Sequence, residues 1–281
     1  MNCFRFIKTV LDELYYQISH EIVNENQRDE AIRSRLEDLS EIYQDLMYTT
    51  NIDYSDPITR FAYIYRYTAA HANMVYQFIR DTQDLRNIFD RPNISVSCVG
   101  GGPGSDLLGV LKFMEREGKS ARLMCRLYDR EEAWGDSWED VYEKLKSTFG
   151  MGISFRRLDV TEPVKWGATY NKLLETDLFT MIFFMSEVFS NKGDADSFFE
   201  YLFGNAKPGS FFLFVDNGSW NFYNWFDSLA MNYNLDCLNG VKYHGFQMEF
   251  DEEKTDLEPY YSKFKDPKLK GTITYRICRK V

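Results

Sequence analysis

The chain has 281 residues, with 43 Asp or Glu against 33 Lys or Arg, and a formal net charge of -10 at pH 7. This length fits one core domain with a substantial appendage, and 44% hydrophobic residues suffice for a sizeable core. The negative charge repels polyanions, so it counts against a nucleic-acid substrate without excluding a local basic patch.

Residues 1–90 are predicted to be helical. Apolar residues recur every three or four positions in two segments, so each helix would have one apolar face to bury. Ser55-Asp56-Pro57 predicts another helix start, because the N–H that proline lacks is not needed at the first helical position. The periodic residues are Phe4, Ile7, Leu11, Leu14 and Ile18, followed by Ile32, Leu36, Leu39, Ile42 and Leu46.

The segment 61–76 is dense in tyrosine. Two roles are open for it. It could pack on a sheet as core, or it could cover a binding pocket, with Tyr63, Arg66, Tyr67 or His71 facing the ligand. We therefore expect a helical cap or substrate region over residues 1–90 and a main domain over 91–281.

Residues 96–109 carry a glycine cluster between an apolar strand and a helix. Gly100, Gly102 and Gly104 alternate, which permits a turn with positive φ and a close approach of the backbone to a ligand. The spacing is not that of the dinucleotide fingerprint, and no Gly-Lys-Ser/Thr follows as in a phosphate loop. The pattern predicts a nucleotide-binding elbow of another kind.

Acidic residues follow the next two predicted strands. Residues 121–128 end at Asp129, and residues 153–158 end at Asp159. In nucleoside-binding folds an acid at the end of the second strand accepts hydrogen bonds from the ribose hydroxyls. The alternative is that each Asp simply caps the helix that follows.

The second half continues the alternation of strands and helices. Residues 177–185 form an apolar run, typical of a parallel strand buried on both faces, which ends at Ser186-Glu187. A helix is predicted over 194–205, and a Lys207-Pro208-Gly209 turn leads into a strand over 210–215 that ends at Asp216-Asn217. Residues 243–250 and 272–278 predict two final strands.

The glycine loop, the two acids and the Lys-Pro-Gly turn together resemble the class I S-adenosylmethionine-dependent methyltransferases over roughly residues 90–280. The resemblance implies an α/β, Rossmann-like sheet of seven mostly parallel strands in the order 3-2-1-4-5-7-6, with helices on both faces. It implies S-adenosylmethionine as cofactor and S-adenosylhomocysteine as product. The implied cofactor residues are Gly100, Gly101, Gly102, Gly104, Asp106, Asp129, Arg130, Trp134, Asp159, Val160, Ser186 and Glu187.

Within this resemblance, Asp129 would hold the ribose and Asp159 the adenine amino group. Members of the family commonly have an acid two positions before the first glycine, where this chain has Cys98. The methionine ammonium would then need another partner, such as Asp106, Glu187 or the N-terminal segment. Of Trp134 and Trp138, one could stack on adenine, or both could pack.

Candidates for catalysis are Glu187, Asp216 and Tyr67, with Asn217 also at a strand end. The acidic charge and aromatic segment favour a small-molecule acceptor. A weaker local similarity, at 185–189, 207–210 and 215–219, to a eukaryotic subgroup that includes fungal ribosomal RNA uridine methyltransferases suggests an RNA base instead. The chain lacks an Asp/Asn-Pro-Pro-Tyr motif, so a cofactor-binding protein without turnover is a third hypothesis. The methylated atom and the oligomeric state stay open.

The five cysteines are scattered, without a C-x-x-C pair, so no metal site is expected. Cys98 and Cys125 fall in predicted strands, as buried thiols of a reducing compartment. No signal peptide or membrane span is predicted, which indicates a cytoplasmic or nuclear protein with no membrane partner. The only basic clusters are expected to be solvated surface; they are Arg156-Arg157 and Lys263, Lys265, Lys268 and Lys270.

Overall fold

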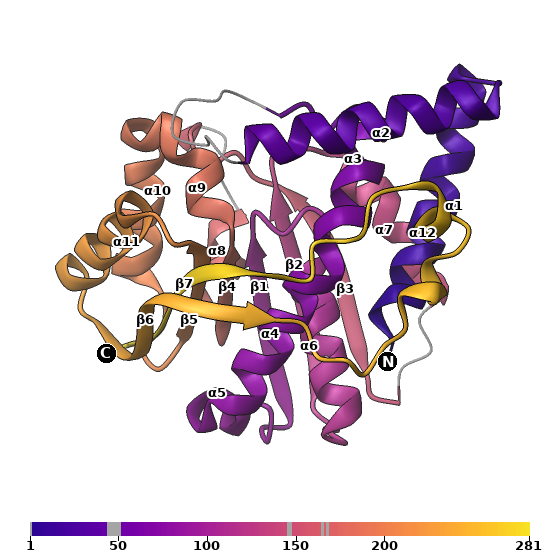
Figure 1. The fold of residues 1–281 in the computed structure, drawn as a ribbon. Coiled ribbons are helices and arrows are strands. Elements are labelled where there is room, and N and C mark those ends of the chain that lie inside the picture. The colour runs from indigo at the N-terminus through magenta and orange to yellow at the C-terminus, as the bar shows by residue number, and fades with distance from the viewer. Residues whose placement is uncertain (1, 44–51, 145–147, 164–165, 167–168) are drawn as a thin grey trace.

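The computed structural model describes residues 2–43, 52–144, 148–163, 166 and 169–281; Leu46 lies outside them. Its centre is a seven-stranded sheet in the order β3-β2-β1-β4-β5-β7-β6, which confirms the predicted fold (Figure 1). β7 pairs antiparallel with both β5 and β6, while the other pairs are parallel. The strands are β1 (Asn93–Val99), β2 (Arg122–Asp129), β3 (Met151–Arg157), β4 (Leu178–Ile182), β5 (Phe211–Asn217), β6 (Leu235–Gln247) and β7 (Lys270–Lys280).

Helices precede, connect and cover the strands. The N-terminal helices are α1 (Cys3–Glu21), α2 (Glu25–Ile42), α3 (Pro57–Tyr63), the π-helical turn η1 (Ile64–Thr68), α4 (Ala69–Asp81) and α5 (Gln83–Ile88). The others are α6 (Ser105–Arg116), α7 (Ala133–Lys144), α8 (Thr169–Leu174), α9 (Phe184–Val188), η3 (Phe189–Asn191), α10 (Lys192–Asn205), α11 (Trp220–Asn232), η4 (Lys254–Leu257) and α12 (Tyr260–Lys263).

The predicted helix start at Ser55-Asp56-Pro57 is confirmed, since the Asp56 side chain accepts hydrogen bonds from the N–H groups of Ile58 and Thr59. Two predicted strands differ most from those of the structure. β4 ends at Ile182, because Phe183 turns the backbone with a φ of 56° and α9 begins at once. The predicted strand over 243–250 instead runs from Leu235 to Gln247, because the chain pairs with β7 over this range, with two irregularities of register.

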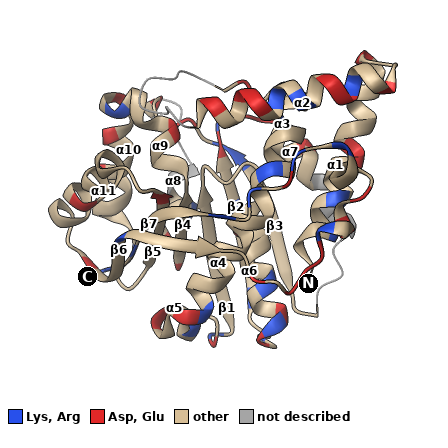
Figure 2. Cartoon of the chain, in the orientation of Figure 1, with Lys and Arg blue, Asp and Glu red and all other residues tan. Residues whose placement is uncertain are grey.

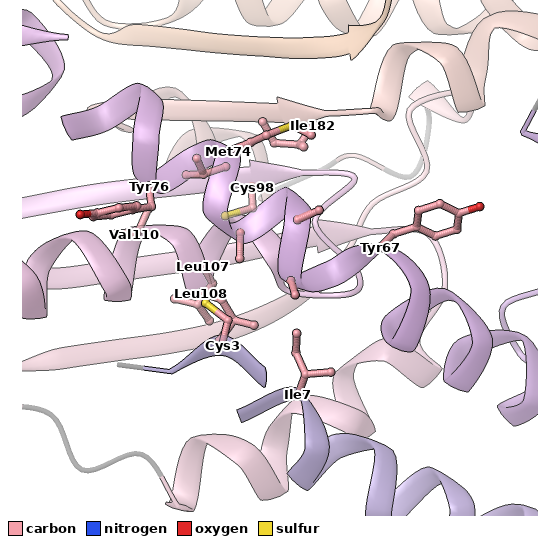
Figure 3. Packing of buried hydrophobic residues seen from close by; sticks show 14 of the residues in the cluster. Cys3, Ile7, Tyr67, Met74, Tyr76, Cys98, Leu107, Leu108, Val110 and Ile182 are labelled. Carbon is pink, nitrogen blue, oxygen red and sulfur yellow. The ribbon is translucent and has the colours of Figure 1, made fainter. Parts of the chain in front are cut away.

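Alternating strand residues supply two separate cores, one on each face of the sheet. Phe179 and Met181 of β4 belong to the cluster that also contains residues of α10 and α11. Leu178 and Ile182 belong to the opposite cluster, which extends through α4 and α6 to α1. Figure 3 shows side chains of α1, α4, α6 and β1 gathered in this cluster. The N-terminal helices therefore share a core with the sheet, and a domain boundary near residue 90 stays a prediction.

The segment between β6 and β7 is tied to α1, α2 and α6 by ion pairs, and Figure 1 shows it beside α1. The buried Lys112 contacts Glu252 at 2.7 Å and Asp251 at 3.0 Å. Lys263 contacts Glu25 at 2.6 Å and Asp29 at 3.0 Å, so it is not the purely solvated residue that the sequence predicted. Most other charges lie on outer helices and connections, around a largely uncharged sheet (Figure 2).

The cysteines differ from expectation in one respect. Cys98 and Cys125 are buried free thiols, as predicted, and Cys3 is another. Cys237 of β6, however, forms a disulfide with its paired residue Cys278 of β7. That pairing was not predicted, and disulfides are rare in reducing compartments. In the described part of the chain, no helix combines the length and apolarity needed to cross a membrane.

We predict that Lys112→Met lowers the free energy of unfolding by about 3 to 5 kcal/mol, because it leaves the buried Glu252 carboxylate without its cation. Lys254→Met is the matched control, since its ion pair with Asp266 is exposed and should be worth less than about 1 kcal/mol. Urea denaturation measures both. Equal small losses in the two variants would contradict the importance of the buried pair.

Candidate functional site

The glycine loop between β1 and α6 depends on glycine for two different reasons. Gly100 and Gly104 adopt φ values of 69° and 71°, a conformation that costs other residues about 1–2 kcal/mol. A Cβ on Gly102 would lie 2.3 Å from the Trp134 ring, and one on Gly104 would lie 1.8 Å from the Trp138 ring. The loop thus turns through positive φ and lets α7 pack directly on its backbone.

Asp129 stands at the end of β2, next to this loop. Its two carboxylate oxygens accept hydrogen bonds from the N–H of Gly102 at 3.1 Å and from the N–H of Glu131 at 3.0 Å. Desolvation by the surrounding protein raises the pKa of Asp129 to about 6, although both hydrogen bonds oppose the shift. The carboxylate links the loop to the next strand and still faces a cavity.

The first cavity runs along the carboxyl ends of the parallel strands. Its empty volume, which includes open solvent at its mouth, is about 820 Å³. Gly100, Asp129 and Asp159 line it in the order of β1, β2 and β3. Asp159 is partly engaged, since its Oδ1 accepts from the Thr161 N–H at 2.9 Å and the Thr161 hydroxyl at 2.6 Å.

Glu187 lies on α9, at the inner end of the first cavity. It accepts hydrogen bonds from the hydroxyls of Tyr43, at 2.8 Å, and Tyr54, at 3.2 Å. Burial raises the pKa of Glu187 to about 7, and the nearby Asp129 adds to the shift. The N-terminal segment therefore reaches into the strand-end site and contributes to its electrostatics.

Three predicted residues lie behind the cavity walls. Asp216 is fully buried and accepts from the N–H groups of Ser186 and Asn217 at 2.9 and 2.8 Å, so it fixes the first turn of α9. Ser186 is buried, and its hydroxyl donates to the carbonyl of Phe183. Asp106 is buried and accepts a hydrogen bond from Thr180 of β4. None of the three lines a described cavity.

Two more cavities continue from the first. A small connecting cavity shares Gly100, Asp129 and Glu187 with it and adds Tyr63 and Phe183. The second cavity, with an empty volume of about 650 Å³ including its mouth, shares Tyr63 and Phe183 with the connecting one. Its other lining residues are Tyr43, Tyr67, Ala70, His71, Met74, Asn217, Phe246, Lys268, Lys270, Gly271, Thr272 and Ile273.

The structure thus brings most of the predicted site residues to the cavities. Arg130 and Val160 line the first cavity, and Tyr67 lines the second. Trp134 lines only the connecting cavity, away from the Asp159 end, while the Trp138 indole N–H donates to the Gly102 carbonyl at 3.2 Å. Gly101, Gly102 and Gly104 form the loop backbone beneath.

Several residues that shape the cavities were missed by sequence reasoning, namely Tyr43, Tyr54, Phe183, Lys268 and Lys270. Phe183 lies next to the end of β4, and Tyr54 lies next to the Ser55-Asp56-Pro57 helix start, so each is close to a feature that the sequence predicted. Their roles depend on contacts across the fold, and no local pattern encodes those contacts.

No protein-family model and no curated protein matches the sequence. Solved structures with a similar fold include a SAM-dependent methyltransferase from Methanosarcina mazei, at 11% identity and a TM-score of 0.45, over 71% of this chain and 98% of that one. The 16S rRNA methylase ArmA is 12% identical at a TM-score of 0.45, over 88% of this chain and 98% of that one. A methyltransferase from Pyrococcus furiosus is 11% identical at a TM-score of 0.41, over 71% and 83%. The likeness extends to the fold and says nothing of a substrate.

We predict that Gly104→Ala costs at least about 2 kcal/mol more stability than Gly118→Ala. Both glycines have positive φ, at 71° and 59°, but a Cβ on Gly104 meets Trp138 whereas one on Gly118 meets nothing within 4 Å. Unfolding of both variants in guanidinium chloride measures their losses in stability. Because the strain of positive φ is common to both, the difference between the losses reports the clash with Trp138. Equal losses would show that the loop does not need its close contact with Trp138.

Stability should also depend on pH through Asp216. Burial raises the pKa of Asp216 to about 7 from its ordinary 3.8, so the folded state binds the proton more tightly than the unfolded state does. The free energy of unfolding should therefore fall as pH rises from about 4 to about 7. Asp216→Asn should flatten this part of the stability profile, measured by urea unfolding at several pH values. An unchanged slope would contradict the raised pKa.

Proposed function

We propose that this chain is an S-adenosylmethionine-dependent methyltransferase whose acceptor is a small molecule. The observation that carries the proposal is the first cavity, where Gly100, Asp129 and Asp159 follow one another along the ends of β1, β2 and β3. In open sheets of parallel strands, ligands bind at this edge, beside the point where the strand order reverses. That point here lies between β1 and β4.

The residues of the cavity fit the cofactor from end to end. The Asp129 carboxylate offers acceptors for the ribose hydroxyls, and Leu158 and Val160 offer apolar walls for a purine near Asp159. At the other end, Glu187 brings a carboxylate to the connecting cavity. When bound, S-adenosylmethionine supplies an electrophilic methyl group on a sulfonium.

Glu187 has the chemistry of a general base. A pKa of about 7 leaves a useful fraction of the carboxylate ionised near neutral pH, which suits proton transfer. Glu187 would accept the proton that an acceptor hydroxyl or amine loses as its heteroatom bonds to the methyl carbon and the methyl–sulfur bond breaks. Tyr43 and Tyr54 orient the carboxylate, and Asp216 positions α9.

The aromatic walls between the cavities exclude water and fix the acceptor, which assists a displacement that needs alignment. Tyr63 and Phe183 provide them, and Tyr67 continues the aromatic wall within the second cavity. The net charge of -10 disfavours the RNA alternative, because phosphate contacts supply most nucleic-acid affinity. RNA retention that weakens steeply with salt would support that alternative instead.

Calorimetry with S-adenosylhomocysteine tests the proposal, and Asp129→Ala is the most informative variant for this measurement. We expect binding by the unaltered chain and at least about a tenfold loss in Asp129→Ala, because charge-assisted hydrogen bonds to the ribose are worth about 1.5–3 kcal/mol each. Asp159→Ala should lose less, because Asp159 would accept a hydrogen bond only from the adenine amino group, whereas Asp129 would accept from both ribose hydroxyls.

The absence of binding by the folded chain would overturn the cofactor assignment, and unchanged affinity in a folded Asp129→Ala would move the ribose elsewhere. Binding without methyl loss from labelled cofactor, in the presence of any acceptor found for the second cavity, would favour the hypothesis of a cofactor-binding protein without turnover.

A further inference from the structure

The second cavity lies between the tyrosine-rich helical segment and the start of β7. Ala70, Met74 and Ile273 give it an apolar interior, and Tyr63 and Phe183 separate it from the connecting cavity. Among the described residues that line it, none is acidic. A cavity with such walls is suited to a small, largely apolar molecule.

His71 adds a buried polar group to these walls. Its side chain is 7% exposed, and its Nδ1 has no hydrogen-bond partner among the described residues. Burial and the nearby Lys268 lower the pKa of His71 to about 3, so the imidazole is neutral and can donate or accept one further hydrogen bond. A buried polar atom without a partner costs free energy.

Flat rings surround this histidine. The imidazole stacks on Phe183 at 4.4 Å between ring centroids, with 20° between the planes, and on Tyr67 at 5.9 Å with 23°. Tyr63, Tyr67 and His71 are spaced by four residues. In a regular α-helix a step of four residues rotates about 40° beyond one full turn, so such residues drift around the helix. The π-helical turn η1 holds more residues per turn, so it reduces this drift and brings Tyr63, Tyr67 and His71 to one cavity. The wall they form favours a planar ligand.

Two cations stand at the mouth of the cavity. The side chains of Lys268 and Lys270 are exposed, and the Lys268 ammonium lies 5.9 Å from the centre of the Tyr67 ring. Within the described part of the chain, neither lysine forms an ion pair, unlike Lys254 and Lys263 of the same segment. This local positive charge, in a molecule with net charge -10, attracts an anion to the mouth.

We propose that the second cavity is the methyl-acceptor site and that it takes a small planar molecule with an anionic group, a carboxylate or a phosphate ester. This assignment rests on the proposed function. The rings of Tyr67, His71 and Phe183 hold the planar part, and Lys268 and Lys270 hold the anion. The nucleophilic end then points past Phe183 and Tyr63 into the connecting cavity, where Glu187 receives its proton.

The test uses benzoate, 2-naphthoate and phenyl phosphate, with benzamide and 2-naphthamide as neutral counterparts of the two carboxylates. Saturation-transfer NMR measures their binding to the full chain in the presence of S-adenosylhomocysteine. Phenol is the neutral counterpart of phenyl phosphate. We expect at least one of the three anions to bind more tightly than its neutral counterpart. The Lys268→Ala/Lys270→Ala double variant should lose about tenfold in affinity for it. Comparison of the affinities for the carboxylates with the affinity for the phosphate ester shows which kind of anion the cavity prefers.

Lys265→Ala is the matched control, an exposed lysine of the same segment that does not line the cavity. It should leave anion binding unchanged, and all these variants should keep their affinity for S-adenosylhomocysteine. Equal binding of acids and amides, no binding of any anion, or an unaffected double variant would overturn the acceptor assignment while the cofactor still binds. Loss of cofactor binding in the unaltered chain would instead contradict the proposed function.

Discussion

The missing Cβ atoms of one loop are the constraint on which the site depends. Because Gly102 and Gly104 have no side chains, Trp134 and Trp138 of α7 lie against the loop backbone. The Trp138 indole then donates to the Gly102 carbonyl, and its ring lies 6.0 Å from that of Phe6 on α1. One backbone turn thus links the sheet to α7 and α7 to the N-terminal helices.

The N-terminal segment and the core complete a single polar centre. Tyr43 and Tyr54 belong to that segment, while Glu187 belongs to α9, which follows β4 in the chain. Their hydrogen bonds stabilise the ionised carboxylate, but burial outweighs them and leaves its pKa raised. Under the proposed function, N-terminal residues that desolvate this acid while holding it in place would provide what a base beside a methyl donor requires.

Local patterns in the sequence were enough to predict the strands, the glycine loop and the acids at the strand ends, whereas the sheet order came from the family that these patterns resemble. These features depend on residues that are close together in the sequence. The positive φ of Phe183, the π-helical turn at Ile64–Thr68, the Lys112–Glu252 pair and the second cavity were not predictable in this way. Each depends on residues far apart in sequence, so only the assembled fold brings it about.

A crystal structure with S-adenosylhomocysteine tests the central claim most directly. The account predicts the ribose at Asp129, the adenine near Asp159, and the sulfur beside Phe183 and Tyr63, facing the second cavity. The tyrosines of the N-terminal segment should still contact Glu187 or the ligand. A ligand bound outside the first cavity, or a sulfur turned away from the second cavity, would contradict the account.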